Sequence, residues 1–291
     1  MFGDCVVKEY MFKKYKNFII YRYMEQLISR YKKTDLSAMS AEIAYYLMLS
    51  IFPFLIFIIN LLSFTPLSNE LLYANLNAFL PNDTGILLKS MLVEALYAKS
   101  GTIMFISMLG GLWIASQGIS AITRGLNKAY DAEENRNFVK LFFLALIATF
   151  GLTIMMMFEF ILIIFGEIIG TYVFGLIGAK KLFVYIWSFL RYCISLVWMI
   201  FTFSLLYKYL PNRKLKFGNV VIGAIFSSVG LVLISVLFSF YVNNFGNYTI
   251  VYGGLGGIIA LMMWFYFSTM IILLGGEVIA IHSDFQNKRK I

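Results

Sequence analysis

The sequence predicts an all-α integral membrane protein with six transmembrane helices and both chain ends on the cytoplasmic side. Hydrophobic residues make up 60% of the 291 residues and charged residues only 13%, with a mean hydropathy of +0.81. A soluble domain of this length needs far more polar surface. In addition, Lys and Arg gather on one side of the apolar segments, which gives the predicted bundle an orientation.

Six apolar stretches are long enough to cross the membrane, because a helix needs ~20 mostly apolar residues to span a hydrocarbon core of roughly 30 Å. The expected spans are 41–64, 101–121, 139–165, 184–208, 218–242 and 256–281. The chain then divides into a basic, aromatic and amphipathic cytoplasmic segment over 1–36, a six-span membrane domain over 37–282 and a basic cytoplasmic tail over 283–291.

The distribution of positive charge predicts the orientation. Of the 24 Lys and Arg residues, 19 lie before span one, between spans two and three, between spans four and five, or in the tail. The opposite connections hold only Lys89, Lys99, Lys180 and Lys181. By the positive-inside rule the basic segments are cytoplasmic. Six spans return the chain to the side on which it starts, so the span count and the charge bias agree.

Residues 8–33 mix basic residues with aromatic ones such as Tyr10, Tyr15 and Tyr23. This composition is typical of an amphipathic helix that lies along an anionic inner leaflet. We favour a simple topological anchor, and the alternative is a segment that binds lipid phosphates. The basic residues are those that the topology requires, so we expect no nucleic-acid partner.

A short amphipathic helical insertion is expected on the outer side between spans one and two, over residues 69–98. Pro81, Asn82 and Asp83 divide it into two stretches, and Asp83 is a suitable N-cap for the second. The insertion is either a lid over a cavity or a plain connector, and the sequence leaves both interpretations open.

Four ionisable residues lie inside the spans: Glu42, Glu159, Arg191 and Glu277. Each costs ~2.5–3.5 kcal/mol in hydrocarbon unless it is paired or hydrated. At about 1.5 Å per residue, Arg191 and Glu159 lie roughly 10 Å and 9 Å below the outer ends of their spans. We therefore predict that Arg191 pairs with Glu159, or with Glu167 nearer the outer boundary. The pair either faces a cavity or only holds spans three and four together.

Glu42 and Glu277 are expected near the inner ends of spans one and six. There a carboxylate can reach toward water or meet Lys208 or Arg124. We rank both glutamates below the Arg191 pair as candidates for a functional site.

Small residues and one proline predict how the helices pack. Pro53 removes a backbone hydrogen bond and should kink span one. Gly111, with Ser107 and Ala115 four positions to either side and Ser116 nearby, predicts a close-packing face on span two. A glycine-rich stretch leads into span six and comprises Tyr252, Gly253, Gly254, Gly256 and Gly257. Helix packing is its favoured use, and the alternative is binding of an anion by exposed backbone N–H groups.

Enzyme signatures are absent from the sequence. His282 is the single histidine, no Cys, His and acidic residues stand at metal-ligand spacing, and no G-x-S-x-G occurs. We therefore expect no catalytic function, no cofactor and no bound metal.

Four groups of residues carry a resemblance over nearly the whole chain. They are Ala41–Tyr46 (with Tyr45) followed by Pro53; Leu112–Ser116 (with Trp113) followed by Asn127 and Arg136; Leu206–Pro211; and Tyr252–Gly256, Trp264 and Leu274–Glu277. In this order they resemble the YihY/BrkB family of bacterial inner-membrane proteins, once labelled as a ribonuclease. The resemblance implies a transporter-like protein of the bacterial cytoplasmic membrane. The ribonuclease label fits the residues poorly, because the cytoplasmic connections offer only Asp131, Glu133 and Glu134 as an acidic cluster.

We favour a translocator of an amphipathic or anionic solute, for example a lipid. Arg191 and the backbone of Gly253–Gly257 would receive the negative group, and Glu159 would release Arg191 when that group arrives. The alternatives are a structural or interaction protein, for instance a homo-oligomer joined through small-residue faces, and, less favoured, a lipid-modifying membrane enzyme. Membrane lipids are the expected partners in every case.

Overall fold

The computed structural model describes residues 19–63, 101–176, 180–245 and 256–288, and within these ranges the chain is helical with no strand. The predicted insertion over 69–98, residues 1–18, and Tyr252, Gly253 and Gly254 lie outside the described residues. The described helices are α2 (Ile19–Lys33), α3 (Leu36–Ser63), α6 (Gly101–Ala129), α7 (Phe138–Leu176), α8 (Lys180–Tyr209), α9 (Phe217–Phe245) and α11 (Gly256–Lys288).

Six of these helices are long and apolar enough to cross a membrane, which confirms the predicted number of spans. The apolar stretches are Leu36–Phe54, Gly101–Ala129, Phe138–Glu159, Phe183–Tyr209, Phe217–Asn244 and Gly256–Gln286. Several helices are longer than a bilayer requires. At about 1.5 Å per residue, the 39 residues of α7 measure ~58 Å. Part of α7 must therefore tilt or project beyond the hydrocarbon core.

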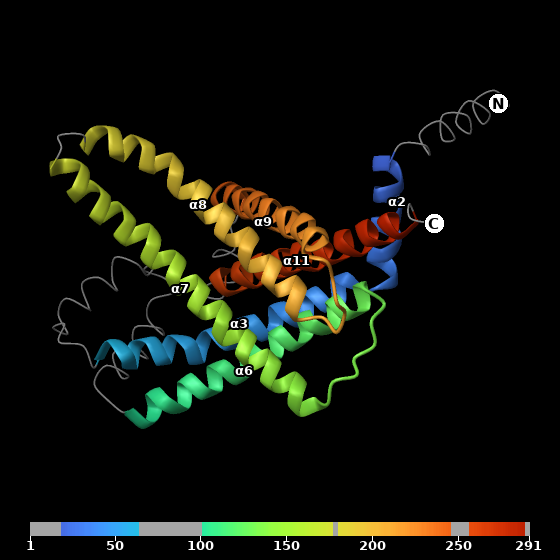
Figure 1. The fold of residues 1–291 in the computed structure, drawn as a ribbon. Coiled ribbons are helices and arrows are strands. Elements are labelled where there is room, and N and C mark those ends of the chain that lie inside the picture. Colours follow the sequence, from blue (N-terminus) through green and yellow to red (C-terminus); the bar gives the residue numbers. More distant parts are fainter. Residues whose placement is uncertain (1–18, 64–100, 177–179, 246–255, 289–291) are drawn as a thin grey trace.

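The basic segments meet at one end of the bundle, which we call the basic end. It comprises α2, residues 130–137 between α6 and α7, residues 210–216 between α8 and α9, and the last turns of α11. In Figure 1, α2 lies across the end of α11, and the connections from α6 to α7 and from α8 to α9 lie at the same end. The predicted gathering of these segments on one side is thus observed, while the side of the membrane that they face stays a prediction.

The small-residue face of α6 packs against α3. A Cβ on Gly111 would stand 3.3 Å from the Cβ of Pro53, and one on Gly118 would stand 3.6 Å from the Cβ of Tyr46. Helix α3 continues through Pro53 to Ser63. The predicted packing of Gly111 is therefore observed, and its partner is the proline that the sequence singles out.

Helices α9 and α11 cross in direct backbone contact. A Cβ on Gly223 would stand 2.5 Å from the carbonyl oxygen of Gly275, and a Cβ on Gly275 would overlap the hydroxyl oxygens of Ser227 and Tyr207. A side chain at either position would force the helices apart. Helix α11 also packs against α3 and α6.

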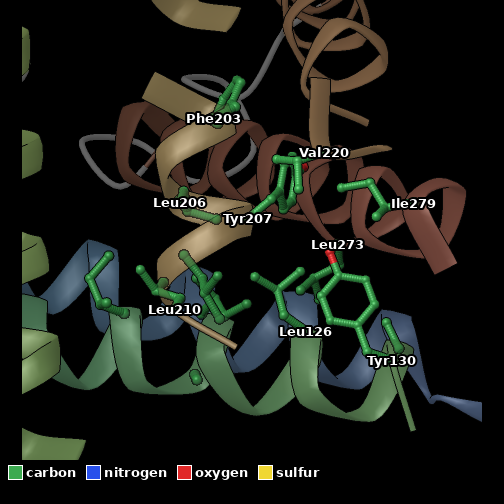
Figure 2. Close-up of a cluster of buried hydrophobic side chains, with 14 of the residues drawn as sticks. Leu126, Tyr130, Phe203, Leu206, Tyr207, Leu210, Val220, Leu273 and Ile279 are labelled. Carbon is green, nitrogen blue, oxygen red and sulfur yellow. The ribbon is translucent and has the colours of Figure 1, made fainter. Parts of the chain in front are cut away.

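The buried core lies in the basic-end halves of the helices. In α6 the buried residues all fall between Ser116 and Ala129, whereas Ile103, Phe105 and Ile106 in its first turns are exposed. Figure 2 shows the core side chains, contributed by α6, α8, α9 and α11. The bundle is therefore most tightly packed at its basic end.

Candidate functional site at the basic end

The basic end holds a network of charged groups around a fully buried carboxylate, that of Glu277 on α11. Arg30, in the last turn of α2, donates from one guanidinium nitrogen to Glu277 Oε2 at 3.4 Å and to the Ala129 carbonyl at 2.9 Å. Its other terminal nitrogen donates to Asp284 Oδ2 at 2.8 Å. Glu277 is 0% exposed and the Arg30 side chain 19%. One guanidinium thus joins α2, the C-terminus of α6 and α11.

The end of α6 is shaped so that Asp131 faces α2. Asp131 has a left-handed φ of 48°, the Ala132 N–H donates to the Asn127 carbonyl at 2.9 Å, and the Asp131 N–H donates to the Lys128 carbonyl at 3.3 Å. This is a Schellman-type helix end. The Asp131 carboxylate accepts from Lys33 Nζ at 3.2 Å and lies 3.9 Å from Arg30. The C-terminus of α6 also carries partial negative charge, which favours the nearby cations.

Two buried tyrosine hydroxyl groups lie against α11. Tyr207 Oη, from α8, is 2.6 Å from Ser227 Oγ and donates to the Ile272 carbonyl at 2.6 Å. Tyr130, from the end of α6, points its hydroxyl toward α11 in Figure 2. Tyr130 Oη and Glu277 Oε1 are both buried without a hydrogen-bond partner among the described residues. Burial raises the pKa of Tyr130 well above its usual value, with smaller contributions from the neighbouring Tyr207 and Glu277.

Asn127 ties the two connections of the basic end together. Its Nδ2 donates to Glu134 Oε2 at 2.7 Å, and its Oδ1 accepts from the Asn212 N–H at 2.7 Å. Arg136 donates twice to the Glu134 carboxylate at 2.6 Å and also to the Leu210 carbonyl at 2.9 Å. Hydrogen bonds from Arg136 are the main reason that the pKa of Glu134 is lowered.

Three residues that the sequence singles out therefore meet here, because Asn127 and Arg136 share Glu134 and Pro211 is buried directly before Asn212. The acidic connection is partly paired within itself, through Glu134 and Arg136. Asp131, in contrast, pairs with α2.

The predictions for the two inner glutamates have different outcomes. Glu42 pairs with Arg124, one of its two predicted partners. For Glu277 the predicted partners, Lys208 and Arg124, are wrong, because its cationic neighbour is Arg30. The turn at Thr34 and Asp35, where Asp35 has a φ of 52°, brings α2 back over the bundle, so Arg30 points into the protein.

The α7–α8 hairpin holds the residues that the sequence ranks first. Trp198 Nε1 donates to the Met155 carbonyl at 3.0 Å and its ring lies 5.0 Å from that of Phe158, while Gly166 faces Trp187. This register puts Arg191 about three residues, roughly 4.5 Å, from the level of Glu159 and about five residues, roughly 7.5 Å, from that of Glu167. An Arg191–Glu159 ion pair is not among those that connect the described side chains. The Glu167 side chain lies outside the described residues, so the pairing of Arg191 stays a prediction.

The remaining predicted residues are spread over the helices. Tyr45 is 51% and Trp113 57% exposed, and the Trp113 ring lies 5.2 Å from that of Phe142. Ser116 is buried and donates to the Trp113 carbonyl at 2.7 Å. Trp264 Nε1 donates to Ser235 Oγ at 3.2 Å. Gly256 and Gly257 form the first turn of α11.

Sequence reasoning missed four members of the central network: Arg30, Tyr130, Tyr207 and Asp284. Tyr207 stands inside one segment that carries the family resemblance, and Tyr130 lies between Asn127 and Arg136 of another, so a signal for both tyrosines was present. The sequence predicts Arg30 only as one base of the topological anchor over residues 8–33, and nothing local links it to a carboxylate 247 positions later. A close pairing of this kind appears only once α2 is folded over α11.

The fold and the network define a six-span helical membrane protein with a packed, charge-rich end. The model of a family described as virulence factor BrkB matches residues 27–291, and the chain belongs to that family. Together the helices and the family make it a multi-pass protein of the bacterial inner membrane.

Related proteins match along most of their length. A Bacillus subtilis protein, YfkH, whose name describes it as ribonuclease-like, is 38% identical over 89% of this chain and 94% of its own. A UPF0761 membrane protein of Aeromonas salmonicida is 27% identical, covering 89% of this chain and 88% of its own. One of Alteromonas mediterranea is 24% identical, covering 90% and 88%. No solved structure matches the chain.

Proposed function

We propose that the protein moves an amphipathic or anionic solute, such as a phospholipid, across the bacterial inner membrane. The observation that carries the proposal is the position of Arg191, a half-buried cation on an apolar transmembrane hairpin. An ionisable residue at such a position is costly, and function is a common reason for its presence.

The surroundings of Arg191 suit a molecule with an anionic group and an apolar body. Tyr185, Phe189 and Tyr192 are 84%, 73% and 66% exposed and line an open, mainly apolar hollow along α8. The Arg191 guanidinium lies 5.1 Å from the centre of the Tyr192 ring. A headgroup could meet Arg191 while acyl chains contact the aromatic side chains, and Glu159 or Glu167 would compete with the headgroup for the guanidinium.

The bundle is packed more tightly at its basic end than at its far end, and this difference would decide where a solute can enter. The basic-end halves of the helices are packed together, whereas Figure 1 shows the far ends of α7 and α8 standing apart from those of α3 and α6. A translocator in this state would be closed at its basic end. Passage would require the layer formed by Arg30, Glu277 and Asp284 to open.

The test is lipid exchange in proteoliposomes that contain the purified full chain and a fluorescent anionic phospholipid. A membrane-impermeant quencher then reports the fraction of label in the outer leaflet over time. We expect the wild type to accelerate exchange and Arg191→Ala to reduce the rate at least tenfold. Lys214→Ala, which removes one exposed positive charge from the basic end, is the matched control and should leave the rate unchanged.

Two outcomes would count against the proposal. Unchanged exchange in Arg191→Ala would remove Arg191 from the mechanism. Wild-type exchange no faster than in protein-free liposomes, for anionic and zwitterionic probes alike, would argue against lipid transport. Mass spectrometry of the recovered lipids distinguishes a lipid-modifying enzyme, since only that activity leaves a covalently altered product.

A further inference from the structure

We propose that Glu277 is a proton-binding site, with the proton carried on the unpartnered atom Oε1. The site is distinct from Arg191 and does not depend on solute transport. The proposal rests on two observations. Two buried oxygen atoms lack hydrogen-bond partners among the described residues, and the ion pairs around Glu277 hold an excess negative charge.

The two unpartnered atoms are the first observation. Glu277 is 0% and Tyr130 1% exposed, and neither Glu277 Oε1 nor Tyr130 Oη has a hydrogen-bond partner among the described residues. Buried polar atoms are nearly always satisfied, so an orphaned carboxylate oxygen points to a bound species that protein atoms alone do not represent. A proton on Oε1 turns that atom into a hydrogen-bond donor, and the hydroxyl of Thr34, which lies against the Glu277 carboxyl group, offers an acceptor.

The charge balance is the second observation. The ion pairs around Glu277 connect three carboxylates, those of Glu277, Asp284 and Asp131, with two cations, Arg30 and Lys33. The network therefore holds one excess negative charge. Asp284 takes the closest contact with Arg30, at 2.8 Å, and Lys33 lies 3.2 Å from Asp131. Glu277, 3.4 Å from Arg30 and the most buried of the three, is the carboxylate left without full compensation.

The other titratable and charged groups at the basic end do not supply the missing charge. Tyr207 on α8 has its hydroxyl engaged with Ser227 and the Ile272 carbonyl. Arg213, which follows α8, donates to the Tyr130 carbonyl. His282 on α11 is bound by Tyr23 through Nδ1 and by Gln286 through Nε2.

A proton fits the site better than a metal ion. Hard divalent cations take about six or more oxygen ligands, and the described residues hold no group of three His, Cys, Asp or Glu side chains that could bind a metal. Protonation transfers one proton from hydronium to the carboxylate and leaves water. It neutralises the excess charge without further ligands, and Arg30 then donates a hydrogen bond to the neutral acid.

The experiment is infrared spectroscopy of the full chain in lipid bilayers at neutral pH. The C=O stretch of a buried, protonated carboxylic acid is resolved from that of a carboxylate. We expect this band in the wild type, its loss in Glu277→Gln and its retention in Glu133→Gln, which changes an exposed carboxylate outside the network. Tyr130→Phe should keep the band, because the Tyr130 hydroxyl makes no hydrogen bond to the acid. Absence of the band from the wild type, or its survival in Glu277→Gln, would overturn the assignment.

A second variant covers the case in which Glu277→Gln does not fold. A second measurement tests whether a metal cation, and not a proton, occupies the site. If Glu277→Gln does not fold, Glu277→Asp should move the band, and an unmoved band overturns the proposal. The thermal midpoint of the wild type is also compared in sodium chloride and in choline chloride. A sodium-dependent rise that Glu277→Gln abolishes would identify a metal cation and overturn the proton assignment. None of these measurements involves transport. The proton assignment can therefore be overturned while lipid exchange is observed, and lipid exchange can be absent while the proton assignment holds.

Discussion

The guanidinium of Arg30 lies 3.4 Å from the buried carboxylate of Glu277, across 247 positions of sequence. The same side chain binds Asp284 and the last carbonyl of α6. Arg30, which the charge distribution alone predicts as a surface base, thus connects α2 to α6 and α11.

Loss of Arg30 should destabilise the fold. Arg30→Ala removes three charge-assisted hydrogen bonds to two other helices, α6 and α11, and we expect a loss of about 2–4 kcal/mol of unfolding free energy. Thermal unfolding of the purified protein in detergent measures the effect. Lys32→Ala, an exposed neighbour on α2, should change stability by less than about 0.5 kcal/mol. Equal midpoints for the two variants would show that the Arg30 contacts do not stabilise the protein.

Gly275 should tolerate no side chain. A Cβ there overlaps the hydroxyl oxygens of Ser227 and Tyr207, so Gly275→Ala must separate α9 from α11 at a cost of about 1–3 kcal/mol. Gly218→Ala is the matched control, because nothing lies within 4 Å of its Cβ position in the first turn of α9. That variant should be neutral or slightly stabilising in the same unfolding assay. A stable Gly275→Ala would contradict the observed crossing.

Both polar atoms of the Asn127 side chain should be needed for full stability. Its amide donates to Glu134 and its carbonyl oxygen accepts from the Asn212 N–H. Asn127→Asp places two carboxylates against each other and should cost about 1–3 kcal/mol. The double variant Asn127→Asp with Glu134→Gln restores a donor facing an acceptor and should recover part of the loss. A double-mutant cycle from thermal unfolding gives the coupling, and simple additivity would argue against the contact.

Glu134 should make stability depend on pH in the acid range. Its pKa is lowered in the folded state, mainly by hydrogen bonds from Arg136. Its contribution is therefore complete above the unfolded-state pKa of about 4.3 and is lost as the pH falls through the lowered, folded-state pKa. The midpoint difference between wild type and Glu134→Gln should stay constant from pH 7 to about 5 and shrink below it. A midpoint difference that widens in acid would contradict the expected sign.

The orientation of the basic end can be tested by thiol labelling. After Cys5 and Cys193 are replaced by Ser, a single cysteine is introduced by Lys214→Cys in one variant and Lys99→Cys in another. By the positive-inside rule, an impermeant reagent should label position 99 in intact cells and position 214 only in inverted vesicles. The opposite pattern would invert the predicted topology.

The number and approximate positions of the spans follow from the sequence alone, because apolar length and loop charge are local properties. Glu42 with Arg124 was also within reach of the sequence, since both residues sit near the same ends of neighbouring spans. The family was recognisable because its motifs keep their order along the chain, whereas the pairing of Arg191 needs side-chain positions that no count of residues supplies.

Only the tertiary structure decided what surrounds Glu277. Hydropathy places this residue at the inner end of a span, where a carboxylate could equally reach water or a nearby base. Its complete burial depends on the turn at Asp35, the left-handed end of α6 at Asp131 and the close crossing at Gly275. Each is a contact between segments far apart in the chain. Such contacts are set by the packing of whole helices, which composition and periodicity do not encode.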